Sequence, residues 1–252
     1  MTSVDLGHVP VVDNHCHGLL SRQPEGLAAW RECFTESRHP ALRREYAATT
    51  LHYHRVVREM AVVLECEARE DSVLAARAAY PPQALCQELL RRAGLGALLV
   101  DTGYPPRDLV IPNADLAGLA GCPVFPMLRV ELLMQDLIAT YATLGGVIEA
   151  LRAALADVRG QGYVALKSVV AYRTGLAVRR WPASDVDQAF RAARAEAATG
   201  GLRLAHQPLL DTLLHVVFAE AARQEVPLQL HVGYGDTDAD MLLANPLAVL
   251  RV

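Results

Sequence analysis

The sequence has few aromatic residues and no excess of positive charge. Aromatic side chains make up 6 % of the 252 residues, and the formal net charge is −4 at pH 7. Base stacking needs aromatic side chains, and binding to phosphate backbones or anionic lipids needs a positive potential. We therefore expect a small-molecule substrate, with neither nucleic acid nor a membrane as a partner.

The sequence also lacks paired cysteines. Its five cysteines are an odd number, and none belongs to a C-x-x-C pair. This pattern argues against a disulfide framework and against a zinc ribbon, and it is typical of a reducing compartment. A basic, apolar leader and a long apolar run are missing too, so we expect a cytoplasmic protein without a signal peptide or a membrane span.

Short apolar runs alternate with stretches of helical periodicity. The five runs, read as strands, lie at about 9–14, 97–100, 124–131, 163–170 and 227–231. The helical stretches lie at 42–60, 72–79, 83–92, 138–158, 185–198 and 208–223. Strands alternating with helices predict an α/β fold with parallel strands, here a single domain over 1–252 with a helical insert at about 18–95.

The first apolar run ends in a His-x-His pair. Successive side chains of a strand point to opposite faces, so His15 and His17 project from one face and Cys16 from the other. Two neutral imidazoles on a rigid strand end form half of a first-row metal site. We therefore predict that both histidines are metal ligands, whereas Cys16 is a small buried apolar side chain.

The other strands also end in polar side chains, namely Asp101, Arg129 with Glu131, Lys167 and His231. In parallel sheets and barrels, the residues at the carboxyl ends of the strands perform the chemistry. His231 precedes a glycine-containing loop at 233–238 and is a candidate third metal ligand. The alternative is a histidine that is satisfied within the core.

The charged side chains admit several roles. Lys167 lies in an apolar strand, so it must pair with an acid, change its pKa or be modified. It could bind a substrate carboxylate, ligate a metal as a carbamate, or form a structural ion pair with Asp101 or Glu131. Arg129 and Arg173 suit a substrate carboxylate, with Glu131 orienting Arg129, although Arg173 could equally be a solvated loop arginine.

A second His-x-His pair, His52 and His54, lies in a stretch of helical periodicity. Residues two apart on a helix point about 200° away from each other around the axis, so they cannot bind one ion together. We therefore predict a structural role for this pair.

The sequence resembles the amidohydrolase superfamily in its first-strand His-x-His, its fourth-strand lysine and its fifth-strand histidine. Within that superfamily it resembles the FluG/nodulin-type subgroup, and the similarity spans essentially the whole chain. The segments that carry this resemblance are VDNHCH at 12–17, CFTES at 33–37, LKSVVAYRTGL at 166–176 and LHVGYGD at 230–236.

The resemblance implies a (β/α)8 TIM barrel and one or two divalent metals, with zinc as the first candidate and manganese or iron as alternatives. It implies hydrolysis of an amide-like C–N bond in a small carboxylate-bearing substrate, with a γ-glutamyl amide as the candidate. Lys167 and His231 would be catalytic, and Arg129, Glu131 and Arg173 would bind substrate. A decarboxylase, a sugar-acid isomerase and a non-catalytic module are the alternatives.

The sequence also departs from the pattern of that superfamily. A complete member continues with a further strand-end histidine and an aspartate that serves as ligand and general base, whereas five strands of the eight are predicted here. We therefore expect an incomplete barrel with exposed strand edges that aggregates or forms a homo-oligomer and turns over little substrate by itself.

Overall fold

The computed structural model describes residues 7–233 and 239–251. Its strands are β1 (Val11–His17), β2 (Leu95–Asp101), β3 (Val124–Arg129), β4 (Ala165–Ser168) and β5 (Leu228–Leu230). Its α-helices are α1 (Gly26–Glu32), α2 (Leu51–Leu64), α3 (Glu70–Ala79), α4 (Pro82–Arg92), α5 (Asn113–Ala120), α6 (Val130–Thr140), α7 (Leu144–Leu155), α8 (Ala183–Ala198) and α9 (Gln207–Arg223).

The described strands form a five-stranded sheet in the order β1-β2-β3-β4-β5. β3 pairs with β4 in parallel, and β4 pairs with β5 in parallel. Helices follow β2 and β3 and separate β4 from β5, as the alternation in the sequence predicts. The result is a mixed α/β fold with part of a TIM-like barrel, and the complete eight-stranded barrel is not present in the described residues.

The chain divides into two compact units. The first comprises Met1–Val100 and Tyr104–Phe125, and the second comprises Asp101–Gly103 and Pro126–Val252. The single domain expected from the sequence stays a prediction, and each unit is described by itself below.

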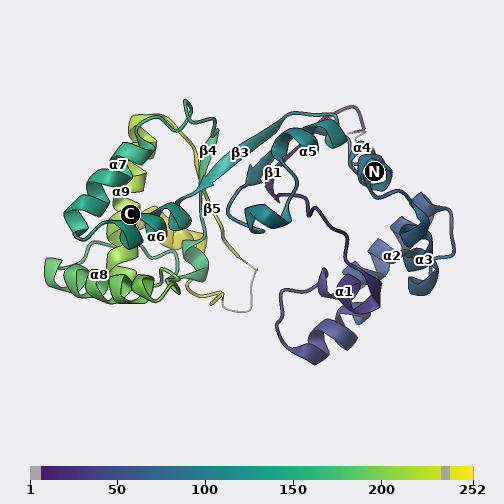
Figure 1. Cartoon of the computed structure of the whole chain (residues 1–252), viewed down its shortest axis with the longest axis horizontal. Coiled ribbons are helices and arrows are strands. Elements are labelled where there is room, and N and C mark those ends of the chain that lie inside the picture. The colour runs from purple at the N-terminus through teal and green to yellow at the C-terminus, as the bar shows by residue number, and fades with distance from the viewer. Residues whose placement is uncertain (1–6, 234–238, 252) are drawn as a thin grey trace, which may run out of the picture. The chain divides into compact units, whose positions relative to one another are not determined.

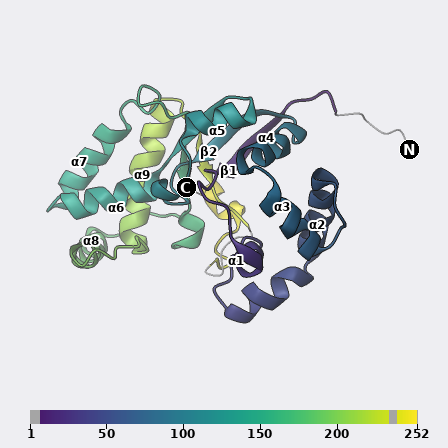
Figure 2. The same ribbon diagram turned by 45° about the vertical axis from the view of Figure 1, so that its right-hand side comes forward.

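The core of the second unit is built by its helices. α9 packs against α7 and α8, and α6 packs against both α7 and α8, an arrangement visible in both ribbon views (Figures 1 and 2). α9 is apolar on most of its surface and buries Leu209, Leu210, Leu213 and Leu214 completely. A helix that is apolar on several faces must be covered on several faces, and its neighbours provide this cover.

The first unit contains the predicted helical insert. α2 and α3 lie side by side (Figure 2) and bury an aromatic and aliphatic cluster that includes Trp30, Tyr53 and Val73. The stretch predicted as one helix over 42–60 divides before α2, because Thr50 is extended and its Oγ1 caps the helix by accepting from the Tyr53 N–H at 3.2 Å. No helix within the described residues is long and apolar enough to cross a lipid bilayer.

Two boundaries near the polar strand ends differ from the sequence prediction. The helix expected over 138–158 is two helices, because Tyr141 is extended and Thr143 caps the start of α7 through the Gly146 N–H. The strand expected over 124–131 ends at Arg129, and α6 begins at the next residue, Val130. Glu131 therefore lies in the first turn of a helix rather than at a strand end.

Core packing of the second unit predicts a clear contrast between two leucines. Leu151 of α7 is 0 % exposed, whereas Leu51 is 88 % exposed. We expect Leu151→Ala to lower the free energy of unfolding by about 2–5 kcal/mol because it leaves a cavity. Leu51→Ala, the matched control, should change it by less than about 0.5 kcal/mol in urea denaturation. Equal effects would contradict this packing.

Candidate active site

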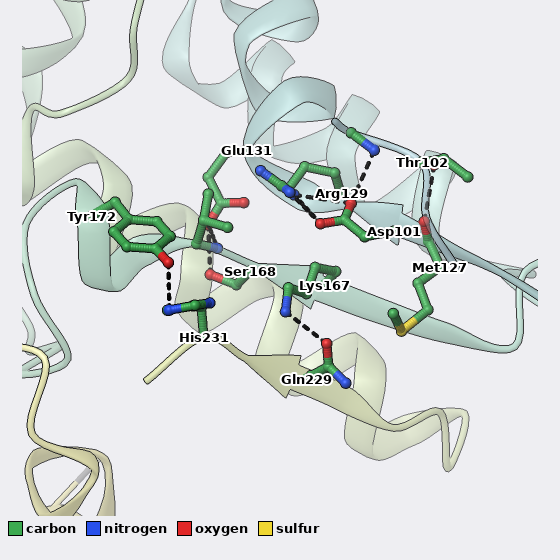
Figure 3. A network of polar contacts seen from close by, with 12 residues as sticks. Asp101, Thr102, Met127, Arg129, Glu131, Lys167, Ser168, Tyr172, Gln229 and His231 are labelled. Atoms are coloured by element: carbon green, nitrogen blue, oxygen red, sulfur yellow. Dashed lines mark hydrogen bonds and ion pairs between the residues drawn. The ribbon is translucent and has the colours of Figure 1, made fainter. Parts of the chain in front are cut away.

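A row of polar side chains crosses the sheet in the second unit (Figure 3). Arg129 of β3 stands opposite Lys167 of β4, and Lys167 stands opposite Gln229 of β5. Directly opposed residues of neighbouring strands share a face of the sheet, so these three side chains lie together. Asp101, at the end of β2, joins the row through Arg129.

Asp101 and Arg129 form a buried ion pair. The side chains of Asp101 and Arg129 are 0 % and 10 % exposed, Nε of Arg129 lies 3.1 Å from both carboxylate oxygens, and its Nη2 donates to Oδ2. The backbone N–H of Gly103 donates to Oδ1 of Asp101 at 2.9 Å. The carboxylate that orients Arg129 is therefore Asp101, at the end of the neighbouring strand β2. The prediction that Glu131 orients Arg129 is wrong.

Gly103 is required for this packing. A Cβ built on Gly103 would lie 2.6 Å from both Cβ and Cγ of Arg129. Those atoms are close to the backbone and cannot swing away as the tip of the side chain could. The absence of a side chain at position 103 therefore lets the arginine stem cross directly over the chain.

Lys167 is buried, with 1 % of its surface exposed. Its Nζ donates to Oε1 of Gln229 at 2.6 Å. Burial lowers the pKa of Lys167 to about 8, an effect opposed by the negative charge of Asp101 and reinforced by the positive charge of Arg129. Below that pH the side chain is mainly an ammonium, so at neutral pH it carries a positive charge next to the guanidinium of Arg129.

Glu131 is completely buried and has a different set of partners. Its Oε1 accepts from Ser168 Oγ at 2.5 Å and from the Val169 N–H at 2.9 Å. Its Oε2 is buried and has no hydrogen-bond partner among the described residues. Burial raises the pKa of Glu131 above its usual range, because an ionised carboxylate would lack water here. Glu131 thus ties α6 to the end of β4.

His231 follows β5 and contacts an aromatic residue that the sequence patterns did not single out. Its Nε2 is hydrogen-bonded to the hydroxyl of Tyr172, and the two ring centroids are 4.3 Å apart (Figure 3). Its backbone N–H donates to the Ser168 carbonyl at 3.0 Å. His231 therefore lies at the same strand end as Lys167 and Ser168, and its predicted catalytic and metal-binding roles stay predictions.

His15 and His17 lie at the end of β1, in the first unit. Both are exposed, whereas Cys16 between them is partly buried and packs against the cluster around Leu98. The alternation predicted for this strand is thus present. The ring of His17 contacts Tyr104 edge-on, with centroids 5.3 Å apart.

The donor chemistry of β1 fits a metal, because two imidazoles emerge from the same face of one strand end. Within residues 7–233 and 239–251, no group of three or more His, Cys, Asp or Glu side chains is gathered closely enough to hold an ion. His15 and His17 belong to the first unit and His231 to the second, so their joint role stays a prediction.

The local structure places the remaining candidates from the sequence. Arg173 follows the 3-10 turn Val170–Tyr172, and its side chain is partly buried, unlike that of a fully solvated loop arginine. His52 and His54 lie in α2 as predicted. Of the glycine-containing loop 233–238 only Gly233 belongs to the described residues, so the rest of that loop lies outside them.

Gln229, Tyr172 and Ser168 are polar residues of this region that were not predicted as site residues from the sequence. Gln229 stands two residues before His231, so strand alternation already places it on the same face as the histidine. That signal was available in the sequence. Tyr172 lies in a short turn, where no periodicity indicates the direction of a side chain.

Comparisons with known proteins place this arrangement among hydrolase-type proteins. The chain is 28 % identical over 268 residues to the protein FluG of Emericella nidulans, covering 94 % of this chain and 31 % of FluG. It is also similar to the crystal structure of a proposed metal-dependent hydrolase from Lactobacillus casei ATCC 334, with a TM-score of 0.81 and 28 % identity. No protein-family model matches the sequence.

The structural match covers 97 % of this chain and 63 % of the Lactobacillus chain. This chain therefore spans less than two thirds of each of the two proteins. Together the comparisons support a hydrolase-type superfamily, and they do not resolve the FluG/nodulin-type subgroup within it.

The close approach of Gly103 to Arg129 predicts the effect of adding one methyl group. We expect Gly103→Ala to cost about 1–3 kcal/mol in unfolding free energy, because it overpacks the site and displaces Arg129 from Asp101. Gly118 of α5 offers a control, because a Cβ added there would meet nothing within 4 Å. Gly118→Ala should stabilise the chain by about 0.5–1 kcal/mol, and a similar gain at Gly103 would contradict the packing.

The buried carboxyl of Glu131 predicts a pH-dependent difference between two variants. Above the usual pKa of a glutamate, the unfolded chain has released this proton whereas the folded chain retains it, so the group makes stability fall as the pH rises. Glu131→Gln cannot titrate. Its stability relative to the unsubstituted chain should therefore improve as the pH rises above about 4, measured by urea denaturation.

Glu131→Ala is the companion variant for this test. It leaves Ser168 Oγ and the Val169 N–H without their acceptor and should cost about 1–3 kcal/mol at every pH. Parallel pH profiles for the unsubstituted chain and Glu131→Gln would show that Glu131 is ionised in the folded chain.

Proposed function

We propose that this chain provides the metal ligands and substrate-binding groups of a metal-dependent hydrolase that cleaves an amide-like C–N bond in a small substrate carrying a carboxylate. The observation that carries this proposal is the structural similarity of 97 % of the chain, at a TM-score of 0.81, to a proposed metal-dependent hydrolase. A γ-glutamyl amide is the first candidate substrate, on the resemblance to the FluG/nodulin-type subgroup.

His15, His17 and His231 are the proposed metal ligands, with zinc as the first candidate and manganese or iron as alternatives. Imidazole nitrogens are preferred ligands of zinc and iron, whereas manganese prefers oxygen ligands, so zinc is the first candidate. A bound ion of this kind lowers the pKa of a water molecule towards neutrality and polarises a carbonyl oxygen. Both β1 histidines are exposed and follow one another at alternate positions of the strand, which supports this assignment.

Lys167 and Arg129 are the proposed binding groups for the substrate carboxylate. Lys167 is held by Gln229, and Arg129 is held by Asp101, so both cationic groups have fixed positions before a substrate arrives. Fixed donors lose little conformational freedom on binding, which favours recognition. Arg173 is a further candidate for the same carboxylate.

A decarboxylase or a sugar-acid isomerase is the second candidate, and one observation favours it. Nζ of Lys167 donates to Oε1 of Gln229, so the ammonium is held in place for a substrate carboxylate. A free ammonium that binds a carboxylate suits decarboxylation or isomerisation as well as hydrolysis. Turnover of γ-glutamyl amides, aromatic acids and uronates, assayed in parallel, separates these reactions.

The two His-x-His pairs of the chain provide a matched test of the metal site. We expect the double substitution His15→Ala/His17→Ala to lower the bound zinc to less than about a tenth of its original amount, because two of the three proposed ligands are lost. Metal content is measured by elemental analysis after loading and desalting.

The double substitution His52→Ala/His54→Ala is the control, because it also removes two imidazoles in a His-x-His pair, but from α2 rather than from β1. Zinc content should be unchanged in this variant. If the two double variants retain equal amounts of zinc, the metal is bound elsewhere and the proposed hydrolase loses its chemical basis.

A further inference from the structure

The Tyr172 hydroxyl forms a hydrogen bond with the ring nitrogen of His231 that faces it. The Tyr172 hydroxyl is hydrogen-bonded to Nε2, and the ring planes are inclined by 37° (Figure 3). Both residues are anchored independently of this contact. The Tyr172 N–H donates to Val169 at 2.9 Å, its carbonyl accepts from Arg203 at 3.1 Å, and the His231 N–H donates to Ser168 at 3.0 Å.

A neutral imidazole has one nitrogen that donates and one that accepts. If the phenol donates to Nε2, the lone pair of that nitrogen is used and the proton of the ring is on Nδ1. If Nε2–H donates to the phenol oxygen instead, the lone pair remains on Nδ1. The first arrangement is chemically favoured, because a phenol is the stronger donor and an imidazole nitrogen is the stronger acceptor.

We propose that Tyr172 is a positioning residue that competes with a metal ion for Nε2 of His231. One lone pair cannot accept the phenol proton and bind a cation at the same time. Metal binding through Nε2 of His231 therefore requires the Tyr172 hydroxyl to leave, and the hydroxyl weakens binding at this nitrogen by the strength of the hydrogen bond. The inference rests on the proposed function, since it assumes that His231 is a metal ligand.

The test measures zinc affinity by competition with a chromophoric chelator in the full chain. Tyr172→Phe removes the hydroxyl and keeps the ring that packs against His231. Because a net hydrogen bond of this kind changes an equilibrium by roughly 2- to 10-fold, Tyr172→Phe should bind zinc tighter by that factor. Tyr141→Phe removes a hydroxyl from the linker between α6 and α7 and should leave zinc affinity unchanged.

A double-mutant cycle links the effect to His231. His231→Ala should weaken zinc binding, and adding Tyr172→Phe to it should have no further effect. Unchanged or weaker zinc binding by Tyr172→Phe, with His231→Ala still weakening it, overturns the competition while leaving the proposed function intact. If His231→Ala has no effect, the competition is overturned as well, and the His15/His17 variants report separately on the metal site.

A second measurement needs no substitution. Long-range 15N–1H correlation spectra of the metal-free chain report which nitrogen of His231 carries the proton. We expect Nδ1 to be protonated and Nε2 to be the acceptor. A ring protonated at Nε2 overturns the inference, because Tyr172 would then accept a proton rather than occupy the lone pair.

Discussion

The buried carboxylate of Asp101 constrains the polar end of the sheet more than any other group. A charge without water must be paired, and Arg129 on the neighbouring strand provides the pair. The guanidinium is thereby fixed over Gly103, which has no side chain in its path. Lys167 and Gln229 extend the same row on the next two strands, so the register of β3, β4 and β5 determines which cations lie together.

Parts of this arrangement follow directly from the sequence. Short apolar runs separated by helical stretches predict parallel strands that alternate with helices, and the polar residue that ends each run predicts where Asp101, Arg129 and Lys167 lie. The alternation of β1 predicts that Cys16 turns towards the apolar cluster and the flanking histidines turn away from it. The inference for β1 depends only on the period of two residues in a strand.

Other parts depend on tertiary contacts and could not be read from the sequence. Glu131 continues an apolar run, so periodicity extends the strand through it, although α6 begins at Val130. The partner of Arg129 is Asp101 rather than Glu131, a choice decided by the proximity of β2 and β3. Tyr172 contacts His231 across a separation of 59 residues, and a short turn gives no local signal for such a contact.

The polar row is proposed to bind the substrate, whereas the histidines are proposed to bind the metal. Arg129 and Lys167 supply fixed positive charge for a carboxylate, whereas the imidazoles supply donors for a metal. X-ray absorption spectroscopy of the zinc-loaded chain tests the proposed metal binding most directly. The proposed site predicts imidazole scattering with Zn–N distances of about 2.0–2.1 Å. A shell with sulfur at about 2.3 Å, or with oxygen alone and no imidazole, would contradict it.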